Sequence, residues 1–421
     1  MKNPALRRGA TLGFMSATAP PSAFARIGHL ASQRRVHEAF GWLHLHQQQI
    51  MRWQQELVAV PAPPFGERPR AEWLCEHFRS VGLSQVSTDG IGNAIGILPG
   101  GDAANGCVLI SAHIDTVFPA ETPIQPQLEG TRLHAPGACD NGAGVSALLA
   151  IASALRHAQL QPASDVIFIG NVGEEGEGNL RGMRWLYEHA PWRNRITAHI
   201  VLDGAGHEVA VTHALGSRRY LVTISGPGGH SWTDAARPNP IVALSRVIAR
   251  LGDLSLDGPP RTTLNVGTIE GGTAINAIPE RAIARFDARS TDAEQLIRLE
   301  VELHRAVEDV VLESNQNVRK ELGLHFSIEK IGDRPAGALP QTSPLLENLR
   351  AVDRHFGIRT EPRIASTDAN IPLALGVPAL SIGAGGEGGG IHTRAEWYDA
   401  RGRELGLRRI LLLLLACSQR A

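Results

Sequence analysis

Residues that can bind a metal or move a proton end three apolar segments of this chain. His113 and Asp115 end the segment SAHIDTV, Glu174 and Glu175 end IGNVGEE, and Asp203 ends AHIVLD. The carboxyl ends of parallel strands lie at one edge of a sheet, where the sites of open α/β folds gather. If these segments are parallel strands, we expect their terminal side chains to lie close together.

Asp140 and His392 are two further candidates for the same site. Asp140 opens the helical segment DNGAGVSALLAIASALRHA, and His392 follows the last predicted strand in GGGIHTRAEW. Each has a simple structural alternative. Asp140 is a suitable helix N-cap, Asp203 a suitable turn residue before Gly204, and a single histidine such as His113 or His392 is often structural. Their agreement on one edge of one sheet favours a site.

The charges of these candidates fit two divalent cations. Two imidazoles and three carboxylates are available, and one hydroxide shared by two cations would bring the site close to neutrality, as a partly buried cleft requires. Mixed imidazole and carboxylate ligands suit zinc, and cobalt or manganese as alternatives. We therefore expect two metal ions held by His113, Asp140, Glu175, Asp203 and His392.

The adjacent glutamates need separate roles. Neighbouring residues at a strand end point to opposite sides, so Glu175 can bind a metal while Glu174 faces the reacting water. We expect Glu174 to be the general base that activates a hydroxide between the metals. Asp115, two residues after His113, is expected to accept the imidazole N–H and fix its tautomer.

Composition excludes several other classes of function. The chain has 421 residues, 43% of them hydrophobic, and a net charge of −1. Neither nucleic acid nor an anionic membrane is expected as a partner, and no stretch of 18 apolar residues exists. Four cysteines without a metal-finger spacing favour a reducing compartment, so we expect a cytoplasmic protein and regard a signal peptide as the less favoured interpretation.

The order of the elements predicts an α/β fold with an insertion. Strands and helices alternate through residues 33–215 and again through 333–421, which predicts a mostly parallel sheet flanked by helices. Residues 216–332 instead carry strands of alternating hydrophobicity and two helices, which predicts an inserted α+β domain with one open sheet face. Residues 1–32 have no assigned role, and we expect a disordered N-terminal extension there.

Together these motifs resemble a family of two-zinc hydrolases. It includes aminoacylases, glutamate carboxypeptidase, acetylornithine and succinyl-diaminopimelate deacylases, and peptidase T. The resemblance runs from about residue 50 to 420, through HIDTV, GACDNGAGVSALL, GEEGEGN, VLDG, GPGGHSW, NAIPERAIARFDAR and GGGIHTRAEWYD. It implies that Asp140 bridges the metals, His113 and Asp203 complete one metal site, and Glu175 and His392 complete the other. It also implies a cis peptide bond after Asp140.

The resemblance assigns roles within the insertion as well. His230 resembles a histidine that reaches the active site of a partner subunit and polarises the scissile carbonyl, so a homodimer through residues 216–332 is implied. Asn276 and Arg289 resemble substrate-binding residues, and Arg289 suits a carboxylate. The alternative for Arg289 is an ion pair on the strand surface, for instance with Asp287.

The implied function is hydrolysis of an amide bond. Asp203 as the fifth ligand, together with STDANIPLALGVPALSIGAG, resembles peptidase T-like members, which favours a di- or tripeptidase that releases an N-terminal residue. The alternative within the family is a deacylase of N-acyl amino acids or a carboxypeptidase, with Arg289 as the anchor. A binding protein without activity is disfavoured because neither a metal ligand nor Glu174 is missing.

Overall fold

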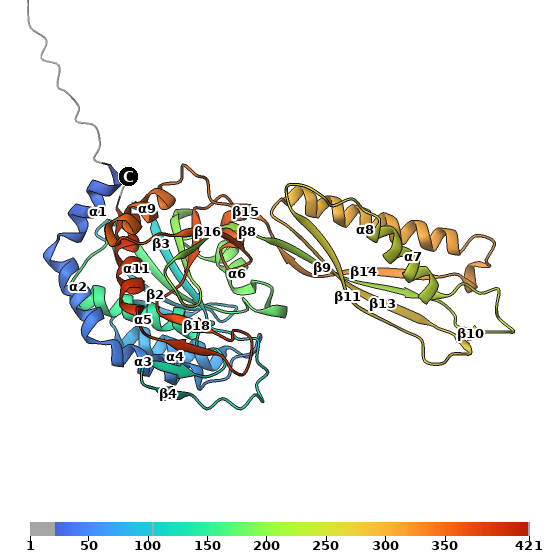
Figure 1. The fold of residues 1–421 in the computed structure, drawn as a ribbon, viewed down its shortest axis with the longest axis horizontal. Helices are drawn as coiled ribbons and strands as arrows, with labels where there is room; N and C mark the ends of the chain where they lie inside the picture. The colour runs from blue at the N-terminus through green and yellow to red at the C-terminus, as the bar shows by residue number, and fades with distance from the viewer. Residues whose placement is uncertain (1–21, 103–104, 420–421) are drawn as a thin grey trace, which may run out of the picture.

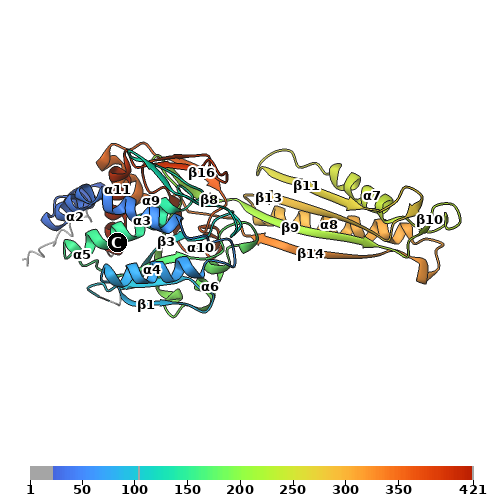
Figure 2. The ribbon, with the colours of Figure 1, turned by 90° about the horizontal axis from the view of Figure 1, so that it is seen from below.

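The protein consists of two bodies joined by a pair of strands (Figures 1 and 2). The structure, a computed structural model, describes residues 22–102 and 105–419. The sheet of the smaller body starts at Gly216 and ends at Arg334. The insertion expected at residues 216–332 therefore corresponds closely to this second body.

A mixed sheet forms the centre of the larger body. Its strands run in the order β1-β2-β6-β3-β7-β17-β8-β15, with β16 paired to β8. Strands β6, β3, β7 and β17 are parallel neighbours, which confirms the predicted mostly parallel centre, and antiparallel strands flank them. The strands are β1 (Ser84–Thr88), β2 (Ala94–Leu98), β3 (Cys107–His113), β6 (Asp165–Asn171), β7 (Ile196–Leu202), β8 (Val209–Ala214), β15 (Gly337–Ala338), β16 (Glu361–Ala365) and β17 (Ala379–Ile382).

Helices cover both faces of this sheet. Along β3, Val108 and Ile110 face one apolar core, and Leu109 faces another with Met183 and Leu186 of α6. Burial on both faces explains why β3 reads as a continuous apolar run. The helices of the larger body are α1 (Ala23–Ala31), α2 (Arg34–Leu45), α3 (Gln47–Val58), α4 (Arg68–Ser80), α5 (Gly142–His157), α6 (Arg181–His189), α9 (Pro344–Phe356), α10 (Asn370–Ala374) and α11 (Arg403–Ser418).

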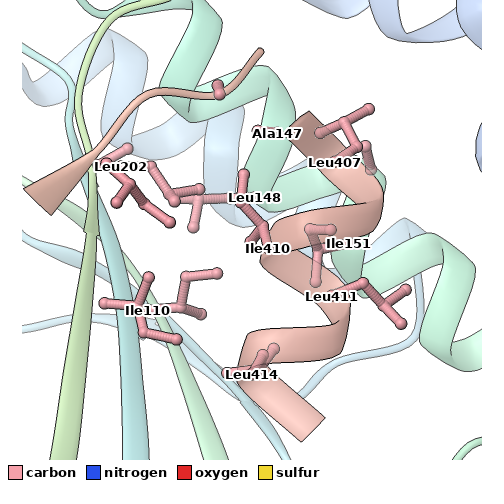
Figure 3. Packing of buried hydrophobic residues seen from close by; sticks show 14 of the residues in the cluster. Ile110, Ala147, Leu148, Ile151, Leu202, Leu407, Ile410, Leu411 and Leu414 are labelled. Atoms are coloured by element: carbon pink, nitrogen blue, oxygen red, sulfur yellow. The ribbon is translucent and has the colours of Figure 1, made fainter. Parts of the chain in front are cut away.

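The C-terminal helix lies in the main core rather than at its edge. Figure 3 shows Leu407, Ile410 and Leu411 of α11 facing Leu148 and Ile151 of α5. All five side chains are fully buried. Each such side chain contributes roughly 1.5–3 kcal/mol by leaving water. This packing holds α5, whose first turn follows Asp140, firmly against the sheet. None of the helices in the described ranges is both long and apolar enough to cross a membrane.

The N-terminal region differs from the expectation in two ways. Residues 23–31, expected to belong to a disordered extension, form α1, because Ile27 and Leu30 are buried in the main core. The rest of that predicted extension, residues 1–21, lies outside the described residues. The single helix expected over residues 33–57 is divided at His46 into α2 and α3.

The smaller body is an antiparallel sheet with helices on one face. Its strands lie in the order β11-β13-β9-β14, and β10 pairs separately with β12. Alternate side chains such as Val222 and Phe286 share an apolar core with Leu244 of α7 and Val307 of α8, as the alternation predicts. The elements are β9 (Gly216–Ser225), β10 (Gly229–His230), α7 (Pro240–Gly252), β11 (Thr262–Gly271), β12 (Ala277–Ile278), β13 (Arg281–Ser290), α8 (Ala293–Ser314) and β14 (His325–Arg334).

A small sheet beside the main one carries the segment around His392. Its strands are paired antiparallel in the order β18-β19-β5-β4. They are β4 (Gln127–Glu129), β5 (Arg132–His134), β18 (Glu387–Gly389) and β19 (Trp397–Asp399). The turn between β18 and β19 contains His392, so this sheet brings a residue from the end of the chain to the edge where β3, β6 and β7 end.

Candidate metal centre

Three parallel strands deliver the predicted ligands to one edge. His113 is the last residue of β3 and lies opposite Asn171, the last residue of β6. Glu175 follows β6 by four residues, and Asp203 follows β7 directly. The register of the parallel sheet therefore places an imidazole and two carboxylates side by side, as strand ends in this architecture do.

Asp140 lies between the two histidines. Its Oδ1 is 2.9 Å from His113 Nε2, and its Oδ2 is 3.1 Å from His392 Nε2. Oδ1 is buried and has no hydrogen bond of good geometry among the described residues. A carboxylate with one oxygen toward each of two imidazoles is arranged to bridge two cations.

Asp203 and Glu175 lie on opposite sides of Asp140. Asp203 Oδ1 is 3.9 Å from His113 Nε2, whereas Glu175 Oε1 is 3.0 Å from His392 Nε2. Donor atoms of His113, Asp140 and Glu175 all lie within 4.8 Å of one another. The donor set would suit two divalent ions: His113 and Asp203 would hold one, Glu175 and His392 would hold the other, and Asp140 would be shared, which would leave positions for water or substrate.

Two carboxyl groups and both imidazoles of the cluster have raised pKa values. Burial raises the pKa of Asp203 to about 7 and that of Glu175 to about 7. The hydrogen bond to Asp140 raises the pKa of His392 to about 9. For His113, burial favours the neutral ring, but Asp115 and Asp140 outweigh it and raise the pKa well above the usual range. Without metal the cluster retains protons that bound cations would replace.

The first turn of α5 is built tightly around Asp140. The peptide bond between Asp140 and Asn141 is cis, as the resemblance implies. The N-cap of α5 is Asn141 rather than Asp140, because the Asn141 side chain accepts from the amide of Gly144. A Cβ at Gly144 would lie 2.3 Å from Asn141 Oδ1, so only glycine fits there. The N-cap alternative for Asp140 is therefore wrong, and its carboxylate is free for the site.

Asp115 makes more contacts within the candidate site than the single predicted one with His113. Its two carboxylate oxygens accept the backbone N–H groups of Glu174 and Glu175 at 3.1 and 2.8 Å. His113 Nδ1 lies 3.2 Å from the Asp115 carbonyl oxygen and 3.5 Å from its carboxylate. One buried aspartate thus orients His113 and holds the backbone of both glutamates.

Glu396 is a supporting residue that the sequence analysis missed. Its buried carboxylate accepts the backbone N–H groups of Gly137, Cys139 and Asp140 at 2.8–2.9 Å. It lies four residues after His392, within a motif that had been noted only for the histidine. Glu396 therefore fixes the segment that carries the Asp140 carboxylate.

Arg334 is the second missed residue. It ends β14, its side chain is nine-tenths buried, and its Nη1 donates to Glu174 Oε1 at 2.9 Å. Its Nη2 also donates to the carbonyl oxygen of Glu174. Among the described residues, the Glu174 carboxylate forms its hydrogen bond and ion pair with Arg334 and not with the expected ligands.

The predicted substrate residues of the insertion do not join this cluster within one chain. His230 lies on β10 at the end of the smaller body that is remote from the larger one (Figures 1 and 2). Asn276 is next to it, since its carbonyl oxygen accepts from Ser231 N at 3.0 Å. Arg289 lies near the junction and pairs with Asp287 at 2.6 Å, the ion pair considered above.

A cleft of about 380 Å³ opens beside Asp140 and Asp203. The rest of its wall comes from β8, β16, β17 and the loop that leads to His392, with apolar side chains such as Val209 and Ile391. The cleft is small, and it borders two carboxylates of the candidate centre.

Several known proteins are similar to this chain in sequence or in fold. A probable carboxypeptidase of Arthroderma gypseum is 27% identical over 261 residues, which cover 55% of each chain. Allantoate amidohydrolase of Bacillus subtilis is 24% identical over 80% of this chain and 86% of its own length. A tripeptidase structure from Staphylococcus aureus has a TM-score of 0.73 at 20% identity, covering 89% of this chain and 99% of that chain.

The first-ranked curated relatives are matched over about half of their length. The family described as "Peptidase family M20/M25/M40" matches residues 109–416, a range that contains every residue of the candidate centre. The chain therefore belongs to Peptidase family M20/M25/M40.

Proposed function

We propose that the protein is a two-metal hydrolase of amide bonds in small peptides, most directly a di- or tripeptidase that releases an N-terminal residue. The observation that carries this proposal is the arrangement around Asp140. Two histidines and two carboxylates surround it, and Glu174 lies beside them without belonging to the ligand set. Such a centre provides ligands, a base and open positions together.

The side chains divide the chemistry among them. Bound divalent ions supply a Lewis acid for the scissile carbonyl and lower the pKa of water. In this proposal Glu174 takes a proton from the attacking water and returns it to the leaving amine. Asp115 holds the backbone of Glu174, and the cleft beside Asp203 offers space for the substrate. We propose zinc as the metal because mixed imidazole and carboxylate donors suit it, with cobalt or manganese able to replace it.

We further propose that the active unit is a homodimer formed through the inserted domain. His230 is exposed and remote from the metal centre of its own chain, so a second copy would have to bring it there. Two large apolar side chains near it, Trp232 and Ile275, are 85% and 104% exposed, as expected of residues that a partner covers. In this arrangement His230 would stabilise the developing oxyanion, and Asn276 would contact the substrate.

A second candidate is the deacylase or carboxypeptidase branch of the family. Two observations support it. Several curated relatives are named probable carboxypeptidases. The side chain of Arg289, near the junction of the two bodies, is 40% exposed. A free substrate carboxylate could replace Asp287 as the partner of Arg289.

One pair of assays separates the two candidates. Zinc-loaded protein is offered a hydrophobic tripeptide with a free N-terminus and the same peptide with an acetylated N-terminus, each with a chelator control. Cleavage of the free peptide alone supports the aminopeptidase. Equal or faster cleavage of the acetylated peptide supports the second branch. Chelator-resistant cleavage, or no cleavage of any amide with added zinc, cobalt or manganese, would contradict the two-metal proposal.

A further inference from the structure

Arg334 links the inserted domain to the candidate base. It is the last residue of β14 and pairs with Ser217 of β9. At this point the two paired strands connect the smaller body to the larger one (Figures 1 and 2). Its guanidinium leaves the inserted domain and ends on Glu174. We infer that Arg334 is the positioning residue that orients Glu174 for proton transfer, an inference that rests on the proposed function.

The two carboxylate oxygens of Glu174 have different surroundings. Arg334 Nη1 donates to Oε1 at 2.9 Å, while Oε2 has no hydrogen-bond partner within the described part of the chain. An oxygen that is held fixes the direction of the carboxylate, and the other oxygen can accept and return a proton. A positioned base needs this combination.

The geometry restricts the whole glutamate rather than its tip alone. The second nitrogen of Arg334 donates to the carbonyl oxygen of Glu174, so the planar fork spans from the main chain to the carboxylate. Asp115 holds the amide of the same residue at 3.1 Å. Main chain and side chain are thus both fixed, which removes rotamers that would turn the carboxylate away from the site.

Arg334 is also the only cation that contacts Glu174 among the described residues. The other charges near Glu174 include the carboxylates of Asp115 and Asp140, which repel it. Without the guanidinium, a buried carboxylate in such surroundings would turn toward water or toward the metals. Arg334 therefore keeps Glu174 in place and distinct from the ligands.

The rest of the junction anchors the same stretch of chain without touching Glu174. Asp333 N donates to Asn179 Oδ1 at 3.0 Å, and Arg184 donates to the Asp333 carbonyl oxygen. Arg184 thus provides a matched control: it is an arginine that fastens the same linker and lies outside the catalytic machinery. Removing it tests anchoring, whereas removing Arg334 tests anchoring and positioning together.

The experiment compares R334Q, R334K and R184Q as zinc-loaded full-length proteins on whichever peptide the wild type cleaves. We expect R334Q to lower kcat by about 10²-fold, within the range of general-base catalysis, with KM changed by less than about 3-fold. R334K should recover part of the loss, and R184Q should stay within about 3-fold of wild type. Equal decreases of kcat in R334Q and R184Q, or a raised KM in R334Q with unchanged kcat, would overturn the inference.

Two further measurements guard against misfolding and against an error in the proposed function. Guanidinium added to R334A should raise kcat at least several-fold, while sodium chloride at equal concentration should not. Crystal structures of the zinc-loaded variants should show the Glu174 carboxylate displaced in R334Q and unchanged in R184Q. These crystal structures test the positioning role of Arg334 even if the wild type cleaves no amide. That second result would contradict the proposed function and would leave the test of Arg334 intact. An undisplaced Glu174 in R334Q would refute the positioning role.

Discussion

Complementation between two inactive variants tests the arrangement of the active unit most directly. Glu174 lies at the carboxyl ends of the central strands, whereas His230 lies at the far end of the inserted domain of the same chain (Figure 2). If His230 serves the partner's centre, Glu174→Gln and His230→Ala damage complementary parts of each site. A dimer that contains one chain of each kind then has one site with both residues intact and one site with neither.

The expected activity follows from counting sites. Random reassociation of equal amounts makes about half of all dimers mixed, and each mixed dimer has one complete site of two, so recovery should be about one quarter of wild-type activity. The parents should be far below this. Loss of an oxyanion donor typically costs about 10²–10³ in kcat, and loss of the base about 10²–10⁴.

The assay mixes the two purified variants under conditions that allow subunit exchange, then measures peptide hydrolysis with zinc present. Mixed dimers isolated through two different affinity tags should reach about half of wild-type activity, because every such dimer has one complete site. Mixing each variant with itself is the control. Activity equal to the mean of the parents, in a mixture shown to contain mixed dimers, would refute the placement of His230 in the partner's site.

The remaining predictions concern the base, its support, the charge of the cluster and the substrate. Glu174→Gln should lower kcat by about 10²–10⁴-fold while bound metal, measured by elemental analysis, stays at the wild-type level. Glu396→Gln should weaken metal binding by about 10–100-fold in competition with a chromogenic chelator, because one acceptor oxygen becomes an NH2 group that faces a backbone N–H near Asp140. In chelated protein the pKa values of Asp203 and Glu175 are raised to about 7, so the folded chain binds more protons than the unfolded chain, and Tm should fall as the pH rises from about 5 to 8. Arg289→Gln should raise KM for a peptide with a free C-terminus more than for its C-terminal amide.

Each of these outcomes has a contrary result. Near wild-type turnover of Glu174→Gln would remove the base assignment, and unchanged metal affinity of Glu396→Gln would show that Asp140 is held by its other contacts. A Tm of chelated protein that rises between pH 5 and 8 would contradict the raised carboxyl pKa values, and metal-loaded protein serves as the control there. Equal changes in KM for both peptides would exclude Arg289 as a carboxylate anchor.

The local features of the site could be predicted because strand ends and residue types carry them. β3, β6 and β7 follow from apolar runs, and their parallel register brings His113, Glu175 and Asp203 together. The inserted sheet was predictable for the same reason, since alternate apolar residues of β13 face α7 and α8. In both cases hydrophobic period and order along the chain determine the geometry.

The supporting contacts could not be predicted, because they join segments that are distant in sequence. Glu396 bonds to amides more than 250 positions away, and Arg334 meets Glu174 across 160 positions. No local pattern marks an arginine at the end of an exposed-looking strand as the partner of a buried glutamate. Helix α1 was missed for a related reason, since its burial depends on contact with α9 and α11 at the other end of the chain.

The paired glutamates illustrate how tertiary contacts resolve a local conflict. Glu174 and Glu175 are both about 6% exposed and adjacent, an arrangement that repulsion and burial both disfavour. The fold gives each carboxylate its own cationic partner from a different part of the chain: Arg334 for Glu174 and His392 for Glu175. Asp115 meanwhile accepts the backbone N–H groups of both residues. The two partners differ in kind, a guanidinium for one glutamate and an imidazole for the other, and in the proposed function this difference separates a base, Glu174, from a metal ligand, Glu175.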